Sequence, residues 1–526
     1  MRCNSVLASL VLTGVCMGAP IPSPYDHGGA EVDPEKALTI VPGKSPIKTK
    51  EYFLGERELL GYAPRFMPTS AVAFDRSNRP YIRASDPGGT PGDGTRDGFI
   101  QTLGDDGRWL AYAIKQELQG KYPGWEGTYA TGVRVGETRV VFDGFGDAYT
   151  LVRTLKPASK QVLLRLREGA DAWEVHEIPV PGALRLEPAD NYGPVSRPPV
   201  VLRESRGVVS LYDIVRSEDG TLTIPPPVTV SPDASFLHPY HSGAGYSSAR
   251  VGDVTYIVYG RSVPEKGDDG EDRPGAPQYV VAYNHLAGEL SQPCLVGFGH
   301  NCYTEKPDVH NGSAIVADSE GFLHVIIGAH QHNFWHVRSK TTAPATSADW
   351  TEPVPLGLRR RYDCGLTYVA LAIDSKDALH VIGRNMSRGT DNEGNALPPD
   401  EMNMQRMTRT LDYLRATKQA DGSWKWEELG PLLVPFHRAY SIFYHKLTLD
   451  RHDRLFLTYY YYADQLSEEA KAAYRARWPE EFTRELPEDA KFPVRAHDPV
   501  IIMSDDGGDT WQIATTEDFM AGMVRE

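Results

Sequence analysis

One pattern recurs seven times in this chain of 526 residues: an alternating apolar and polar stretch, a polar turn, and a second alternating stretch. Alternation with a period of two is typical of β-strands, and a turn rich in Asp, Ser, Asn or Gly between two such stretches predicts a hairpin. The seven hairpins begin at Ala71, Tyr129, Val200, Tyr246, Ser313, Tyr368 and Leu447. Their number, and their spacing of roughly 45 to 80 residues, predict an all-β fold, a seven-bladed β-propeller with loop and helical insertions.

A pair of β-sandwiches is the alternative, since sandwiches also consist of many hairpins. It does not explain why the turns share the form D-x-x-G, or a relative of it, at the same point of each unit. The stretch from Ser504 to Trp511 also fits the Asp-box pattern S-x-D-x-G-x-T-W, a turn found between outer strands of propeller blades. We expect this turn to be structural, with side chains bonded to the turn backbone and the tryptophan packed between blades.

The N-terminal region predicts export. Residues 1–19 are typical of a signal peptide, because Arg2 precedes an apolar run and small residues follow it; a buried N-terminal strand is the alternative. A linker is expected over 20–45 and the propeller over 46–520, with insertions at 262–276, 386–421 and 464–496. Residues 464–486 are expected to be helical, and 386–421 a helical or irregular flap. No later segment approaches the ~20 apolar residues that a membrane-spanning helix needs. We therefore expect a secreted or periplasmic protein.

Cysteines and charge limit the partners. Cys3 and Cys16 fall in the signal, so at most one disulfide forms among Cys294, Cys302 and Cys364, with Cys294–Cys302 as the local candidate. No paired CxxC spacing exists, which excludes a zinc ribbon, whereas a mixed site near His300 and Cys302 stays open as an alternative. The net charge of −15 argues against nucleic-acid binding. We expect a monomer without a membrane or nucleic-acid partner.

Chemistry concentrates at the ends of the fifth and sixth hairpins. His310 precedes the first strand of the fifth and His330 follows its second strand; Tyr368 and Arg384 hold the corresponding places in the sixth. A hairpin returns its ends to one side, so all four side chains are expected at one site. Removing the proton α to a uronate carboxylate needs a base, an acid for the leaving oxygen and a cation on the carboxylate, which His, Tyr and Arg supply.

Other histidines have simpler explanations. His324 and His380 occupy equivalent places in second strands and are expected in the blade core. His332 and His336 alternate with Asn333 and Trp335, so one of the two is expected to face solvent. For His310 alone a structural role is the alternative, and only the matched set across two blades favours a functional one. Further contributions to the rim are expected from His437, Arg438 and His445.

At these residues the sequence resembles the BNR-4 repeat group, whose characterised members are β-propeller polysaccharide lyases, including ulvan lyases and rhamnose–glucuronate lyases. The resemblance covers roughly residues 278–390 and rests on a D-x-H-N…D-x-x-G-x-x-H-V…H…R-S pattern from Asp308 to Ser339, and on the T-Y…G-R hairpin from Thr367 to Arg384. It implies acid–base roles for His310 and Tyr368, carboxylate neutralisation by Arg384, and no cofactor requirement; a structural metal stays open. Substrate-binding residues are expected to be Asn311, His330, Trp335 and Arg338.

Two features depart from that group. Its corresponding segment lies in early blades, whereas about 300 residues precede it here, and a shifted blade order preserves a site only because a propeller is nearly symmetric. The strand that usually reads Y-R is Gly383-Arg384 here, which predicts open space beside the arginine.

The leading hypothesis is a polysaccharide lyase that cleaves an anionic, uronate-containing and rhamnose-rich (ulvan-like) glycan by β-elimination. A sialidase-type hydrolase is the second hypothesis, and its arginine triad would come from Arg338, Arg359, Arg360, Arg361 and Arg384. The third hypothesis is a non-catalytic glycan-binding propeller that uses exposed aromatic side chains, Trp335 and residues Tyr459 to Tyr462.

Overall fold

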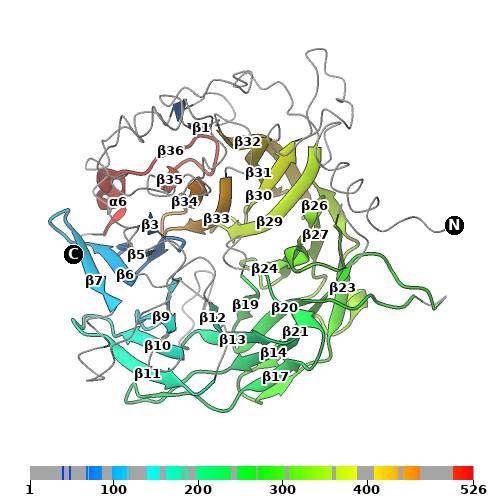
Figure 1. The fold of residues 1–526 in the computed structure, drawn as a ribbon, viewed down its shortest axis with the longest axis horizontal. Helices are drawn as coiled ribbons and strands as arrows, with labels where there is room; N and C mark the ends of the chain where they lie inside the picture. Colours follow the sequence, from blue (N-terminus) through cyan, green and yellow to red (C-terminus); the bar gives the residue numbers. More distant parts are fainter. Residues whose placement is uncertain are drawn as a thin grey trace, which may run out of the picture.

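The computed structural model describes residues 38–40, 47–48, 67–68, 70–85, 98–114, 118, 139–153, 161–180, 184–187, 197–238, 246–267, 270–301, 307–357, 363–387, 408–435, 442–461 and 501–524. Seven antiparallel sheets follow one another in sequence order around a central axis, as Figure 1 shows. The predicted seven-bladed β-propeller is confirmed.

Blades one to three use the N-terminal part of the chain. Blade one holds β3 (Met67–Pro68), β4 (Ala73–Phe74), β5 (Pro80–Ser85), β6 (Gly98–Leu103) and β7 (Trp109–Ala113). Blade two holds β8 (Val140–Phe142), β9 (Ala148–Arg153), β10 (Gln161–Leu166) and β11 (Glu174–Ile178). Blade three holds β12 (Leu184–Glu187), β13 (Val200–Ser205), β14 (Val208–Tyr212) and β17 (Val228–Ser231), beside a ribbon of β15 (Val215–Arg216) and β16 (Leu222–Thr223).

Blades four and five follow. Blade four holds β18 (Ser235–Phe236), β19 (Ser248–Val251), β20 (Val254–Arg261), β21 (Ala276–Asn284), β22 (Glu289–Leu290) and β23 (Cys294–Gly299). Blade five begins after the 3-10 turn η3 (Val309–Asn311) and holds β24 (Ala314–Ala317), β25 (Leu323–Ile327), β27 (Phe334–Arg338) and β28 (Val354–Leu356), with η4 (Ser347–Asp349) before β28.

Blades six and seven complete the ring. Blade six holds β29 (Asp363–Ile373), β30 (Leu379–Ser387), β31 (Thr408–Lys418) and β32 (Trp424–Pro435), extended by β26 (His330–His332) on one edge and by β1 (Leu38–Ile40) and β2 (Ile47–Lys48) on the other. Blade seven holds β33 (Ile442–Leu449), β34 (Leu455–Tyr461), β35 (Ile501–Ser504) and β36 (Gln512–Ile513), and α6 (Thr516–Gly522) follows it. Middle strands such as β25 are buried along their whole length, because both faces pack against neighbouring blades.

The repeated turn has one structure in five blades. Its first residue is an aspartate whose Oδ1 accepts the backbone N–H groups of the residues two and four positions later; these are Asp75, Asp143, Asp318, Asp374 and Asp450. The fourth residue of each turn has a positive φ and is Asn, Asp or Gly, the residues that tolerate this conformation best. The shared turn chemistry therefore reflects a shared backbone geometry.

Neighbouring turns are joined to one another. The second residue of one turn donates its backbone N–H to the side chain of the fourth residue in the turn of the next blade. Ser319 donates to Asp377 (2.7 Å), Ser375 to Asp453 (2.9 Å), and Arg451 to Asn78 (2.9 Å). This face of the molecule thus carries a continuous series of links from blade five through six and seven to blade one.

The junction between blades seven and one closes the ring without a shared strand: within the described residues, blade one comes wholly from 67–113 and blade seven wholly from 442–513. Asn78 donates hydrogen bonds to Asp450 Oδ2 and to the Gly522 carbonyl, both at 2.9 Å. Phe519 of α6 packs against Phe74 and Phe456, with ring centroids 6.4 and 5.2 Å away. Side-chain contacts and one short helix therefore hold the ring shut.

Several predicted details differ from the structure. Tyr129 and the first stretch of the hairpin expected there lie outside the described residues; the second stretch of that hairpin forms β8, which pairs with β9 across the turn 143–147. The expected insertion 386–421 includes β31, the third strand of blade six, and the expected linker includes β1, which pairs with β32. The expected insertion 262–276 falls between β20 and β21, and its last residue is the first of β21.

The Asp box is structural, as predicted. It connects β35 to β36, Ser504 Oγ donates to Asp506 Oδ1 at 2.8 Å, and the buried Trp511 packs edge-on against Tyr413 of blade six. Cys294 is a free, buried thiol, and its candidate partner Cys302 lies outside the described residues, as do residues 1–19 and the insertion 464–496. Among the helices that the structure describes, none is long and apolar enough to cross a membrane.

Candidate active site

The two ends of the fifth hairpin meet on the face opposite the aspartate turns. A Cβ atom on Gly328 would lie 2.1 Å from the carbonyl oxygen of Gly312, so the backbone that leaves β25 touches the backbone that enters β24. The end of blade four joins them, since the His300 carbonyl accepts the His330 N–H (2.9 Å) and the Asn311 amide (2.7 Å). Glycine permits this close approach, and it brings His310 and His330 together.

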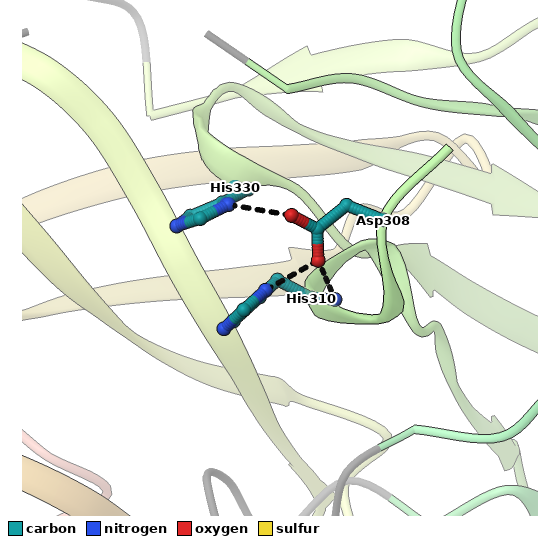
Figure 2. Close-up of side chains that lie close together, drawn as sticks. All are labelled: Asp308, His310 and His330. Atoms are coloured by element: carbon teal, nitrogen blue, oxygen red, sulfur yellow. Dashed lines mark hydrogen bonds and ion pairs between the residues drawn. The ribbon is translucent and has the colours of Figure 1, made fainter. Parts of the chain in front are cut away.

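Asp308 holds both histidines. It is the N-cap of η3, and its Oδ1 accepts the backbone N–H of His310 at 2.8 Å and also the Nδ1 of the same residue. Its Oδ2 lies 3.0 Å from His330 Nδ1 and accepts from Asn301 Nδ2 at 3.2 Å, as Figure 2 shows for the histidines. One carboxylate thus contacts two imidazole rings, one from each end of the hairpin.

The electrostatics of this cluster follow from burial and hydrogen bonding. Burial opposes ionisation of Asp308, but the hydrogen bonds from His310 and His330 outweigh it, so the pKa of the carboxyl lies well below its usual value. Burial also lowers the pKa of His330; Asp308 partly offsets this, while the charges of His310 and Arg384 lower the pKa further. At neutral pH the carboxylate is therefore ionised and His330 is largely neutral.

Tyr368 and Arg384 from blade six extend the cluster. The His310 and His330 rings are stacked with centroids 4.1 Å apart, and the Tyr368 ring lies 5.3 Å from that of His310. Arg384 Cζ lies over the Tyr368 ring, 4.5 Å from its centroid. The four residues predicted from the hairpin ends are thus brought together, with His310 29% exposed at its side chain and Tyr368 and Arg384 buried.

A local distortion aims Tyr368 at His310. The register between β29 and β30 shifts between Thr367 and Ala370, and Tyr368 has a φ of 65°. On the facing β26, Gln331 has a φ of 57°, and its N–H donates to Thr367 Oγ1 at 2.9 Å. A bulge of this kind re-aims a side chain relative to regular alternation, and the unusual backbone conformations persist only where surrounding contacts hold them.

The remaining predicted residues divide between site and scaffold. Asn311 is buried and closes the capping box by accepting the Asp308 N–H (2.8 Å), so it supports the cluster. Trp335 lies beside His300, with ring centroids 6.1 Å apart. Arg338 is not brought to the cluster: it pairs with Asp318 (3.3 Å) and stacks over Phe322, in the aspartate turn at the opposite end of the blade.

The buried histidines are structural, as predicted for His324 and His380. His324 pairs with Asp318 and with His336, and His380 pairs with Asp374 and with the Tyr413 hydroxyl. His445, expected at the rim, is fully buried and bonds the Ile382 carbonyl at 3.1 Å. His437 and Arg438 lie outside the described residues.

Two further expectations are corrected. Gly383 leaves no open space beside Arg384, since a Cβ there would lie 2.8 Å from the Phe334 ring. Tyr459, proposed as an exposed sugar-stacking residue, is buried. Asp308 belonged to the quoted motif without a predicted role; the signal that marks it is its place two residues before His310, where an N-cap carboxylate bends back over its own turn.

Asp308, His310 and His330 are also the group of potential metal ligands found among the described residues, with ligand atoms within 4.8 Å of one another. The two rings are stacked at an interplanar angle of 20°, so the in-plane lone pairs run side by side and do not converge on one point. This arrangement suits two separate hydrogen bonds to a carboxylate better than coordination of one ion.

Comparisons with known proteins find distant similarity of fold. No model of a known protein family matches the sequence, and no curated protein matches it. Among solved structures, an ulvan lyase of a new polysaccharide lyase family, bound to a GlcA(1-4)Rha3S saccharide, aligns with 75% of this chain and 92% of its own at 11% identity and a TM-score of 0.39. An intramolecular trans-sialidase from Ruminococcus gnavus aligns with 77% of this chain and 91% of its own, at 10% identity and a TM-score of 0.34. A protein of unknown function from Dyadobacter fermentans aligns with 77% of this chain and 93% of its own, at 8% identity and a TM-score of 0.35.

Proposed function

We propose that this protein is a polysaccharide lyase that cleaves a uronate-containing glycan by β-elimination. The observation that carries the proposal is the sequence of contacts from Asp308 through His310 to Tyr368 and Arg384. In this series His310 would act as the base, Tyr368 as the hydroxyl proton donor and Arg384 as the cation, and each residue contacts the next.

The reaction follows from these groups. His310 removes the proton on C5 of the uronate, the bond between C4 and O4 breaks, and its electrons leave with O4, which takes a proton from Tyr368. The electrons of the C5–H bond form the C4=C5 double bond. Arg384 neutralises the adjacent carboxylate and so stabilises the negative charge that develops on it during proton removal. The sequence resemblance to lyases of rhamnose–glucuronate glycans supports rhamnose-rich, ulvan-like chains as the substrate class.

The arrangement supports a sialidase-type reaction less well. That chemistry needs three arginines around one carboxylate, and Arg338 is committed to Asp318 at the other end of blade five. Arg359, Arg360 and Arg361 lie outside the described residues, which leaves Arg384 as the candidate arginine beside the cluster within the part that the structure covers.

The test is an ultraviolet assay for the unsaturated uronate with ulvan, gum-arabic side chains and glycosaminoglycans as substrates. We expect product from at least one glycan, and we expect His310→Ala to abolish it while the unfolding temperature stays close to that of the wild type. Release of a reducing sugar without the unsaturated chromophore would instead indicate a hydrolase. Binding without any turnover, unchanged in His310→Ala, would indicate a glycan-binding propeller.

A further inference from the structure

The Asp308 carboxylate accepts four hydrogen bonds. His310 N–H and His310 Nδ1 approach Oδ1, and His330 Nδ1 and Asn301 Nδ2 approach Oδ2. An ionised carboxylate has no proton to donate, so each ring nitrogen that bonds to it carries the proton. A neutral imidazole with a proton on Nδ1 has a bare lone pair on Nε2.

We propose that Asp308 is a positioning residue that fixes His310 in the Nδ1–H tautomer and so makes its Nε2 the atom that takes the substrate proton. The inference rests on the proposed function for the identity of that proton, but the tautomer itself is a property of the protein alone. Within the described residues, Nε2 of His310 has no hydrogen-bond partner, which agrees with an atom that faces substrate.

The Asp308 carboxylate is held by contacts that do not depend on the His310 ring. Asp308 begins η3, and the capping box with Asn311 holds its main chain, since Asn311 Oδ1 accepts the Asp308 N–H and Asn311 Nδ2 is anchored on the His300 carbonyl. Asn301 holds Oδ2 from the end of blade four. The carboxylate therefore cannot rotate to follow the ring, and the ring takes the orientation that the carboxylate imposes.

The same blade contains a carboxylate–histidine pair of the opposite kind. Asp318 bonds His324 Nε2 at 3.3 Å, but both side chains are fully buried, and the second nitrogen of His324 is occupied by His336 at 3.0 Å. That pair contributes to packing at the aspartate turn. It provides a matched control for the partly exposed Asp308–His310 pair, because the two carboxylates lie just before and just after β24 and each bonds a histidine.

Several charged and titratable groups face His310, and the test must distinguish the effect of Asp308 from the effects of the others. Asp308 lies on its own segment, His330 faces it from β26, Tyr368 from β29, and Arg384 from β30 behind the Tyr368 ring. Asp308→Asn removes the charge but keeps a good N-cap, so η3 still forms. The asparagine amide offers one acceptor oxygen and one donor group where two acceptors stood, so one ring must turn over or lose its bond.

The experiment combines kinetics with nitrogen-15 NMR of histidine-labelled full-length protein, with His310 assigned by its absence in His310→Gln. We expect the Nδ1–H pattern for His310 in the wild type and a mixture of the two tautomers in Asp308→Asn, because a neutral amide oxygen is a weaker acceptor for the Nδ1 proton than a carboxylate. In the same variant we expect kcat to fall about 100- to 10,000-fold with little change in KM and a shifted pH–rate profile, as for loss of a positioned base. Asp318→Asn should lower the unfolding temperature and leave the tautomer and the pH profile unchanged.

An Nε2–H tautomer for His310 in the wild type would overturn the inference, as would an Asp308→Asn variant with the wild-type tautomer and rate. If no uronate glycan yields an unsaturated product, the proposed function fails, but the NMR comparison of the two variants still decides whether Asp308 sets the tautomer. If lyase activity is present and both variants lose it equally with unchanged pH profiles, Asp308 is only structural.

Discussion

The guanidinium carbon of Arg384 lies 4.5 Å from the centre of the Tyr368 ring, and both side chains are buried. A cation over an aromatic face is attracted to it, and the attraction grows when water is excluded. The pair therefore fixes the tyrosine ring in place. In the proposed reaction Arg384 holds the Tyr368 ring and neutralises the substrate carboxylate, while Tyr368 donates the proton to the leaving oxygen.

Tyr368→Phe should separate these tasks. The phenylalanine ring keeps the contacts with Arg384 and His310, so the unfolding temperature should stay close to that of the wild type, while turnover should fall about 100- to 10,000-fold because the proton donor is gone. Tyr413→Phe is the control, since its hydroxyl bonds His380 and the Gly507 carbonyl on the structural side of blade six. It should cost about 1–3 kcal/mol of stability and no activity. Equal activity losses in the two variants would contradict the assignment.

Arg384 and Arg338 should respond differently to substitution. Arg384→Lys keeps the charge but loses the planar, two-pronged donor, so turnover should fall even though a cation remains. Arg338→Lys alters only the contact with Asp318 and the stacking over Phe322, so KM and kcat should stay at their wild-type values. A large rise in KM for Arg338→Lys would mean that Arg338 reaches substrate after all.

The buried histidines should make the protein sensitive to acid. Burial lowers the pKa of His445 to about 3, with the charge of Arg384 acting in the same direction, and it lowers the pKa of His336 strongly. The unfolded chain takes up these protons below pH ~6.5 while the folded state does not, so stability falls as pH drops below that value, by up to about 1.4 kcal/mol per pH unit for each group. Urea unfolding at pH 7.5 and pH 5 should show a smaller loss for His445→Gln than for the wild type. If His445→Gln lost as much unfolding free energy between pH 7.5 and pH 5 as the wild type, His445 would not be a source of the acid sensitivity.

Asn78 should be a sensitive position in the junction between blades seven and one. It has a φ of 59°, and its side chain bonds Asp450, Gly522 and Arg451. Asn78→Gly keeps the backbone conformation and loses these bonds, which should cost about 1–3 kcal/mol. Asn78→Ala adds the strain of a left-handed residue, a further ~1–2 kcal/mol. Chemical denaturation of both variants measures the two contributions, and equal losses would show that the backbone conformation contributes nothing.

The parts of this fold that the sequence predicts are local. A turn such as Asp318–Phe322 needs only its own residues, because the aspartate bonds the backbone of its own turn. The meeting of the hairpin ends at one site is also predictable from the sequence, since antiparallel pairing returns both ends of a hairpin to the same side. The expected insertion 386–421 overlaps β31, because the sequence does not mark where the long connection from β30 ends and the next strand begins.

The parts that were missed depend on contacts between segments. The position of Tyr368 comes from a bulge, which reverses the alternation that sequence reasoning assumes. Arg338 was expected to bind substrate because it belongs to the R-S pair of the quoted motif, but β27 runs from the site end of the blade to the turn end and carries Arg338 away from the site. The role of Asp308 requires His330, 22 residues later, to return to the same carboxylate, and only the folded hairpin shows this.

The ring junction has a consequence for how such a chain can vary. Every blade keeps its main strands within one segment, and the link from blade seven to blade one uses the same turn contact as the links from five to six and from six to seven. The closing of the ring therefore uses the same kind of contact as two junctions inside the chain, with α6 as an addition at blade seven. Because the cluster takes its residues from the ends of blades four, five and six, a rearrangement of blades would preserve it only where these three blades stay neighbours.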